Sequence, residues 1–163
     1  MSHLESLKSA PLETAEEIVN GPGPVLRDVH FYKIRAELAE EGNEFTSHND
    51  GFPSSDEESA PDIEVGIGLR TRQSAEVLGV RVHFTARTDL WKVSLDVAAE
   101  FVAESAFETT NAARTDFADK VGIMTLFPYI RETVASMTQR TYGASVVLPT
   151  IRNGEISFLE RAE

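Results

Sequence analysis

The chain has 163 residues, which suits a single domain large enough for a hydrophobic core. Its formal charge of −12, from 27 Asp and Glu against 15 Lys and Arg, argues against nucleic acid or an anionic membrane surface as a partner, because both require a basic patch. The absence of cysteine excludes disulfides and thiolate metal sites. Since the sequence also has no signal-like or membrane-spanning apolar run, we expect a cytoplasmic protein.

Residues 1–24 are predicted to form an N-terminal arm ahead of one domain over residues 25–163. A short amphipathic pattern predicts a helix in this arm that begins near Pro11 and ends at the Gly- and Pro-rich residues 20–24. An isolated helix of this length is marginal in water, so it either packs on something or frays.

Four stretches of alternating apolar residues predict four strands. The first, residues 25–38, changes the parity of its alternation, which indicates a bulge. The other three are residues 63–69, 80–86 and 91–101, with a turn near Thr88 between the last two. The alternation predicts an antiparallel sheet with one buried face.

Residues 40–62, between the first two strands, contain eight acids and neither Lys nor Arg. We interpret them as a mobile acidic loop. Phe45 and Phe52 are the apolar exceptions, and their simplest role is to pin the loop to the body of the domain.

Residues 123–143 carry the helical periodicity of the chain, with apolar residues at spacings of three and four. Pro128 lacks an amide proton, so we predict a break or kink between Phe127 and Pro128. A polar connector over residues 104–114 and a short helical piece over residues 115–121, capped by Thr115, precede this helix. The expected class is α+β, a four-stranded antiparallel sheet with one long helix packed on one face.

Such a sheet leaves a broad apolar face poorly covered in a monomer, which invites a second copy of the chain. After the helix, residues 145–151 and 155–159 read as a small hairpin around Asn153-Gly154.

No catalytic constellation is visible in the sequence. The four histidines are scattered, no Gly-x-Ser-x-Gly or glycine-rich phosphate loop is present, and the acids Asp56, Glu57 and Glu58 are best interpreted as a solvated charge run. We therefore expect no enzyme activity, no metal and no cofactor.

The long helix also carries a motif: Leu126-Phe127-Pro128-Tyr129, then Arg131-Glu132, then Ser136-Met137 and Arg140. This order, which periodicity does not require, resembles the main helix of the SecB family of protein-export chaperones. Residues 26–36 also resemble the first strand of the toxin-antitoxin-associated branch of that family. The sequence after the helix departs from the family, because it keeps only Leu148-Pro149 of the usual proline-rich run and shows no pattern for a full second helix.

The resemblance implies an ATP-independent holdase, a homotetramer built as a dimer of dimers, that binds unfolded polypeptide in apolar grooves. Its client would be an exported protein or an antitoxin. Candidate groove or interface residues, each as compatible with the core, are Leu126, Phe127, Pro128, Tyr129, Ile130, Trp91, Phe101 and Phe107, with Phe45 and Phe52 as possible rims of the groove.

Two further implications concern partners. Acidic residues on the sheet face dock the motor SecA in the export branch, and Tyr32 and Lys33 near that position put this docking in doubt. The alternative function is a peptide-binding adaptor that kept the fold without holdase activity.

Overall fold

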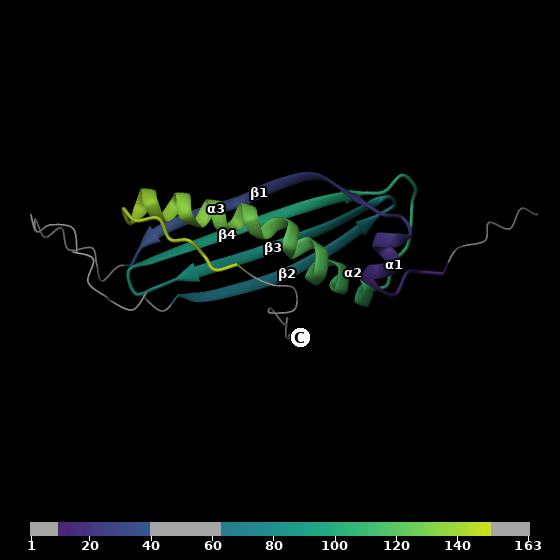
Figure 1. Ribbon diagram of the computed structural model, residues 1–163, viewed down its shortest axis with the longest axis horizontal. Coiled ribbons are helices and arrows are strands. Elements are labelled where there is room, and N and C mark those ends of the chain that lie inside the picture. The colour runs from purple at the N-terminus through teal and green to yellow at the C-terminus, as the bar shows by residue number, and fades with distance from the viewer. Residues whose placement is uncertain (1–9, 40–62, 151–163) are drawn as a thin grey trace, which may run out of the picture.

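One four-stranded antiparallel sheet forms the body of the protein, with its strands in the order β1-β4-β3-β2 (Figure 1). The computed structural model describes residues 10–39 and 63–150. The strands are β1 (Val25–Leu38), β2 (Glu64–Ser74), β3 (Val77–Arg87) and β4 (Trp91–Val102). The expected α+β class and the four antiparallel strands are confirmed. The acidic stretch with Phe45 and Phe52 lies outside the described residues, as do the turn at Asn153 and the second arm of the predicted hairpin. Residues 145–150 of its first arm are described and form no strand.

Strict alternation in β3 and β4 produces the two faces of the sheet. In β4 the residues from Trp91 to Phe101 at odd positions are buried, and Lys92 and Asp96 lie on the opposite face. The bulge predicted in β1 is confirmed, since its register with β4 shifts between Leu26 and Asp28 and again between Phe31 and Lys33.

Short turns join the last three strands. The two-residue turn between β2 and β3 places Ala75 at φ 48°. The carbonyls of its residues, Ala75 and Glu76, accept hydrogen bonds from the amides of Phe107 and Ala103, respectively, in the connector after β4. Between β3 and β4 the Thr88 hydroxyl accepts from the amides of Leu90 and Trp91. The predicted turn near Thr88 is therefore confirmed.

A continuous helical run follows β4. It consists of α2 (Asn111–Phe117), the π turn η2 (Ala118–Gly122) and α3 (Ile123–Thr141). The predicted cap at Thr115 is wrong, because Thr110 accepts the capping hydrogen bond from the amide of Ala113, while the Thr115 hydroxyl donates to the Asn111 carbonyl inside the helix. The helix α2 therefore begins four residues before the predicted piece. Its sequence looks like a polar connector because few of its residues are apolar.

Of the predicted break or kink between Phe127 and Pro128, the break is wrong, because α3 continues through Pro128, and the kink stays a prediction. An interior proline costs roughly 3 kcal/mol through its lost hydrogen bond and its steric clash. Leu126, Phe127 and Ile130 are buried on either side of it, and each contributes about 1.5 to 3 kcal/mol by burial. Packing on the sheet therefore outweighs the penalty.

Gly122 brings the helical run into direct contact with β3. A Cβ atom at this position would lie 2.7 and 2.9 Å from the two methyl carbons of Val80, closer than any ordinary carbon–carbon contact. Val80 is fully buried. Only a residue without a side chain allows this approach.

The N-terminal arm docks on the rest of the domain through α1 (Ala15–Asn20), in which Ala15 and Ile18 are buried. The Ala15 amide donates to the Asp116 carboxylate at 2.9 Å, and Lys120 lies 2.7 Å from the same carboxylate. The hydrogen bond from Lys120, followed by that from Ala15, holds the pKa of Asp116 below its usual value. This carboxylate joins α1 to α2 and η2.

Candidate functional site

The helix α3 covers one face of the sheet unevenly (Figure 1). It lies obliquely across the strands and packs on β4, β1 and β3. On the edge strand β2, the residues that face the same side are Val65, Ile67 and Leu69, as their register with Ala86, Phe84 and Val82 of β3 requires. Val65 remains 49% exposed and the other two are half-buried. We call Val65, Ile67 and Leu69 the apolar strip.

The residues after α3 run back beside the helix as an extended segment (Figure 1). Leu148 is buried in the core at 2% exposure, while its neighbour Val147 is 65% exposed. Val146 is half-buried against the same core. The segment therefore fills part of the helix side and presents one aliphatic side chain to solvent.

Two side chains of α3 hold this segment in place. The Arg131 Nε donates to the Leu148 carbonyl at 2.9 Å, and the fully buried Thr138 hydroxyl accepts from the Val146 amide at 2.9 Å. Thr138 also donates to the Val134 carbonyl, so both capacities of its hydroxyl are used. Arg131 is the arginine of the Arg-Glu pair in the helix motif. Its hydrogen bond to Leu148 gives this motif residue a structural role in this chain.

The structure distributes the sequence-predicted residues between core and surface. Leu126, Phe127, Ile130, Trp91 and Phe101 are buried in the core, and the Phe101 ring meets Phe117 edge to face. Phe107 is half-buried against that core. Pro128 and Tyr129 are exposed on α3, with Tyr129 at 44%. Their roles in binding or assembly stay predictions.

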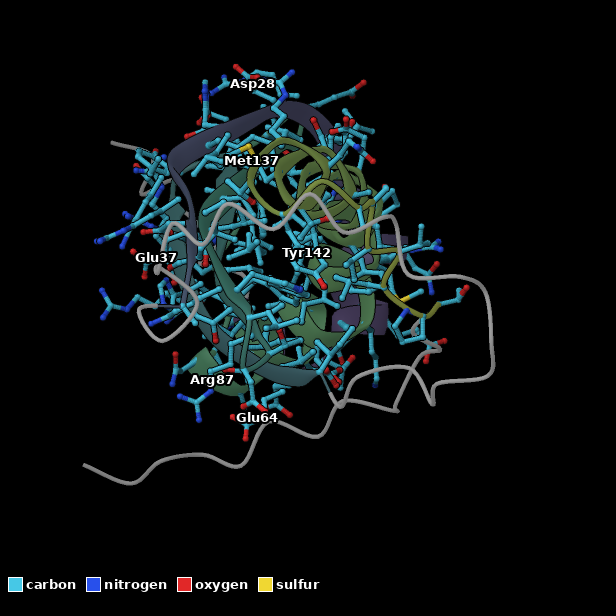
Figure 2. The ribbon with its side chains drawn as sticks, turned by 90° about the vertical axis from the view of Figure 1, so that its left-hand side faces the viewer. Asp28, Glu37, Glu64, Arg87, Met137 and Tyr142 are labelled. Atoms are coloured by element: carbon cyan, nitrogen blue, oxygen red, sulfur yellow. The ribbon has the colours of Figure 1, made fainter. Side chains whose placement is uncertain are left out.

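A second aliphatic surface follows β1. Ile34 and Leu38 pair in register with Leu95 and Trp91 of β4, so they share the helix side of the sheet, and both are nearly half exposed. In Figure 2, which looks along the strands, Met137 lies on this side of the sheet, while Glu37 and Arg87 project from the opposite side. Both edges of the helix side thus carry exposed aliphatic residues.

Within residues 10–39 and 63–150, no group of three or more His, Asp or Glu residues could hold a metal ion. No helix in those ranges is both long and apolar enough to cross a lipid bilayer.

Sequence reasoning missed the apolar strip, Leu148 and the anchoring role of Arg131. The strip did have a signal, the alternation of aliphatic residues with Gly66 and Gly68. What the alternation could not indicate was which strand the helix leaves uncovered, because that depends on non-local packing.

No protein-family model matches the chain. A search of curated proteins finds the SecB-like chaperone SmegB of Mycolicibacterium smegmatis, which is 27% identical over 103 residues, or 63% of this chain and 70% of that protein. Among solved structures, the fold is similar to the Mycobacterium tuberculosis Rv1957 SecB-like chaperone, at a TM-score of 0.60 and 18% identity, over 79% of this chain and 88% of that one. The chain is SecB-like in sequence and in fold.

The resemblance to the SecB family stated from the helix motif is thereby confirmed, and the packing of the long helix α3 on a four-stranded sheet matches the SecB-like fold. The Rv1957 chaperone was solved in complex with a ChAD peptide from the Rv1956 HigA1 antitoxin.

Proposed function

We propose that this SecB-like protein is an ATP-independent chaperone that holds extended or non-native segments of other proteins on the helix side of its sheet. The observation that carries the proposal is the apolar strip, a row of aliphatic side chains left half exposed beside the core. The solved complex of the similar Rv1957 protein with an antitoxin peptide supports a polypeptide as the occupant.

The strip has the properties that a weak and sequence-tolerant polypeptide site needs. Complete burial of a Val, Leu or Ile side chain yields about 1.5 to 3 kcal/mol, so a half-exposed one retains about 1 kcal/mol for a client. In the part of the chain that the structure describes, β2 also has no strand on its outer edge. An extended client could therefore add backbone hydrogen bonds beside β2 while its side chains cover the strip.

A charge placed in the strip tests this proposal. We expect Val65→Asp to weaken suppression of the aggregation of an unfolded model protein, so that several-fold more chaperone is required. The control is Val19→Asp on α1, which makes the same change at the same exposure, 48% against 49%, away from the strip. Equal effects of the two variants would contradict the proposed site.

The proposal favours a dedicated client, such as an antitoxin, over a broad set of exported proteins. The support is the antitoxin peptide bound to Rv1957. A dedicated chaperone should protect one partner and fail with most unrelated unfolded proteins, whereas a general holdase should suppress the aggregation of several. A toxin and antitoxin pair among the neighbouring genes would favour the dedicated role.

We also propose that the protein assembles, as a homotetramer built from two dimers. In support, β1 is a 14-residue edge strand whose exposed Ile34 and Leu38 extend an aliphatic surface to the edge of the sheet. Mass measurement at micromolar concentration tests the assembly, and Ile34→Lys should shift it to smaller species. A stable monomeric wild type would refute this part of the proposal.

We do not expect this protein to dock to SecA. Docking in the export branch uses acidic residues on the sheet face, whereas the strand residues that face away from α3 here include more cations than carboxylates. It keeps the cytoplasm as the working compartment. If the protein binds a peptide and suppresses no aggregation at all, the adaptor function replaces the chaperone.

A further inference from the structure

The face of the sheet opposite α3 is basic, although the chain is strongly acidic. The four strands carry eight Lys and Arg and five Asp and Glu, and their register and contacts assign all of these to this face. The whole chain has 15 cations and 27 acids, so seven cations and 22 acids remain for the rest. We call this surface the open face.

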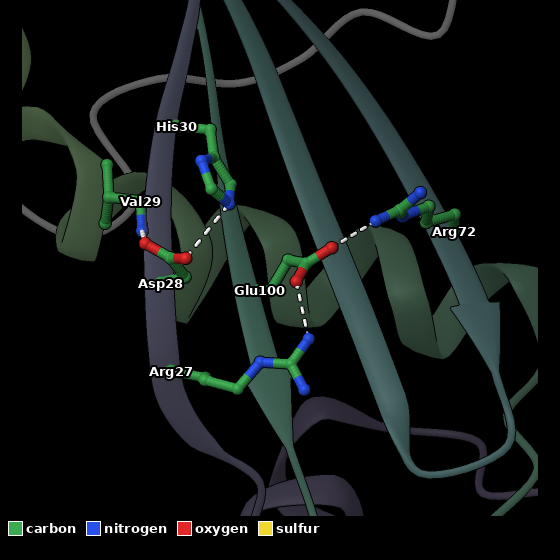
Figure 3. Close-up of polar contacts among 6 residues, drawn as sticks. All are labelled: Arg27, Asp28, Val29, His30, Arg72 and Glu100. Atoms are coloured by element: carbon green, nitrogen blue, oxygen red, sulfur yellow. Dashed lines mark hydrogen bonds and ion pairs between the residues drawn. The ribbon is translucent and has the colours of Figure 1, made fainter.

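The carboxylates of the open face are already engaged. Glu100 accepts hydrogen bonds from both Arg27 and Arg72 (Figure 3). Asp96 accepts two hydrogen bonds from Arg81, at 2.6 and 2.7 Å. These hydrogen bonds hold the pKa of both carboxyl groups below their usual values. The carboxylates therefore stay charged at neutral pH, and the surplus on this face is cationic.

A shallow depression of about 230 Å³ lies on the open face, where small residues meet long ones. Gly79 and Ala98 lie between Tyr32, Arg70, Arg72 and Arg81. The Arg72 side chain lies over Gly79, where an added Cβ would meet it at 2.8 Å. Arg81 stacks on the Tyr32 ring, 4.3 Å from its centroid. The depression thus presents guanidinium groups that are partly ordered before anything binds.

The spacing of the cations matches an extended polypeptide. Arg70 and Arg72 on β2, and Lys33 and Arg35 on β1, are each two residues apart and so about 7 Å apart along a strand. Carboxylates on alternate residues of an extended segment have the same spacing. In the described strands, Tyr32 is the only Phe, Tyr or Trp on this face, and Arg81 covers it. Sites for single-stranded nucleic acid instead combine several aromatic stacking platforms.

We propose that the open face is a second docking surface, which binds an extended acidic segment of a partner protein through the net positive charge of this face, at the depression lined by Arg70, Arg72 and Arg81. This surface is separated from the apolar strip by the sheet itself. It takes a ligand of opposite chemistry, so it does not rest on the proposed chaperone function.

The probe is a fluorescent twelve-residue peptide of alternating Glu and Ser, with a Gln and Ser peptide as its uncharged match. We expect the Glu peptide to bind and its affinity to fall as salt rises, while the Gln peptide does not bind. Arg70→Gln should weaken binding about three- to five-fold, the range of one exposed ion pair, and Arg140→Gln on the exposed face of α3 should leave it unchanged. Equal loss in both variants would overturn the proposal.

A second variant should strengthen binding, which a misfolded protein could not do. Glu100→Gln removes the carboxylate that engages Arg27 and Arg72, so the Glu peptide should bind about three- to five-fold more tightly. No gain in this variant contradicts the proposed site.

Two other occupants would overturn the proposal. One is nucleic acid, if a single-stranded oligonucleotide binds more tightly than the peptide and with the same dependence on Arg70. The other is the chain's own acidic stretch, if the peptide binds only after the eight acids of residues 40–62 are changed to amides.

Discussion

The contact between Gly122 and Val80 allows the magnitude of a substitution to be worked out. In Gly122→Ala the new Cβ would lie 2.7, 2.9 and 3.1 Å from the three side-chain carbons of Val80, where carbon atoms ordinarily stay about 3.5 to 4 Å apart. Val80 has little room to move aside, because it is fully buried and χ1 of its β-branched side chain is restricted. Overpacking of this kind costs about 1 to 3 kcal/mol.

Part of that cost is offset because alanine orders more readily than glycine in a helix, by about 0.5 to 1 kcal/mol. We therefore expect the free energy of unfolding to fall by about 1 to 2 kcal/mol and the melting temperature to fall by about 3 to 6 °C. The assay is urea unfolding at fixed protein concentration, followed by the fluorescence of Trp91, the single tryptophan of the chain, which is buried.

The matched control is Gly68→Ala on β2, where the new Cβ would meet the His83 Cβ at an ordinary 3.7 Å and stability should change by less than about 0.5 kcal/mol. A double-mutant cycle isolates the cause, because in a Val80→Ala background only the 3.1 Å approach to the Cβ of residue 80 remains, so the Gly122→Ala change should cost much less than in the wild type. The reasoning is refuted if Gly122→Ala is as stable as the wild type, or if its full penalty persists without the valine.

Three further predictions concern hydrogen bonds. Arg131→Gln should speed amide hydrogen exchange in the segment after α3 about 5- to 30-fold, because it weakens the hydrogen bond to the Leu148 carbonyl. Arg140→Gln changes no such bond and should leave the exchange rates as they are. Equal exchange rates in the two variants would contradict the anchoring by Arg131. The pKa of Glu100 lies below its ordinary 4.5 because of the two arginines that flank it, so the stability it contributes is present above pH 4.5 and lost as the pH falls through the folded value. The urea midpoint should accordingly drop more between pH 5 and 3 in the wild type than in Glu100→Gln, and parallel curves would exclude the linkage. Thr110→Ala should lower the free energy of unfolding by about 1 kcal/mol, because it removes the N-cap of α2, and this loss should exceed that of Thr115→Ala. A larger loss in Thr115→Ala would contradict the assignment of the cap to Thr110.

Local signals were enough to predict much of the sheet. The first strand has the predicted bounds, because a Gly- and Pro-rich stretch precedes it and its alternation runs to Leu38. The second strand continues to Ser74, five residues beyond the predicted end. Thr71 and Gln73 occupy its helix-side positions there, so the apolar alternation is lost while the strand continues. Gln73 is tolerated because its side chain bonds the Thr109 amide and the Phe107 carbonyl.

The candidate site was less predictable. Large aromatic residues were the natural candidates, yet Trp91 and Phe101 fill the core, where their area is worth most. The exposed aliphatic residues on β2 are exposed only because α3 crosses the other strands. No periodicity within β2 carries that information, since it concerns the position of a helix some fifty residues later.

The two-residue turn at Ala75 has a consequence that reaches both sides of the sheet. Strand residues alternate strictly between faces, so one residue added to this turn, if it slipped the pairing of β2, would exchange the aliphatic side chains of that strand with its arginines. An insertion of two residues would restore the original parity. Length variation that slips this pairing should therefore be accepted in even steps and rejected in odd ones.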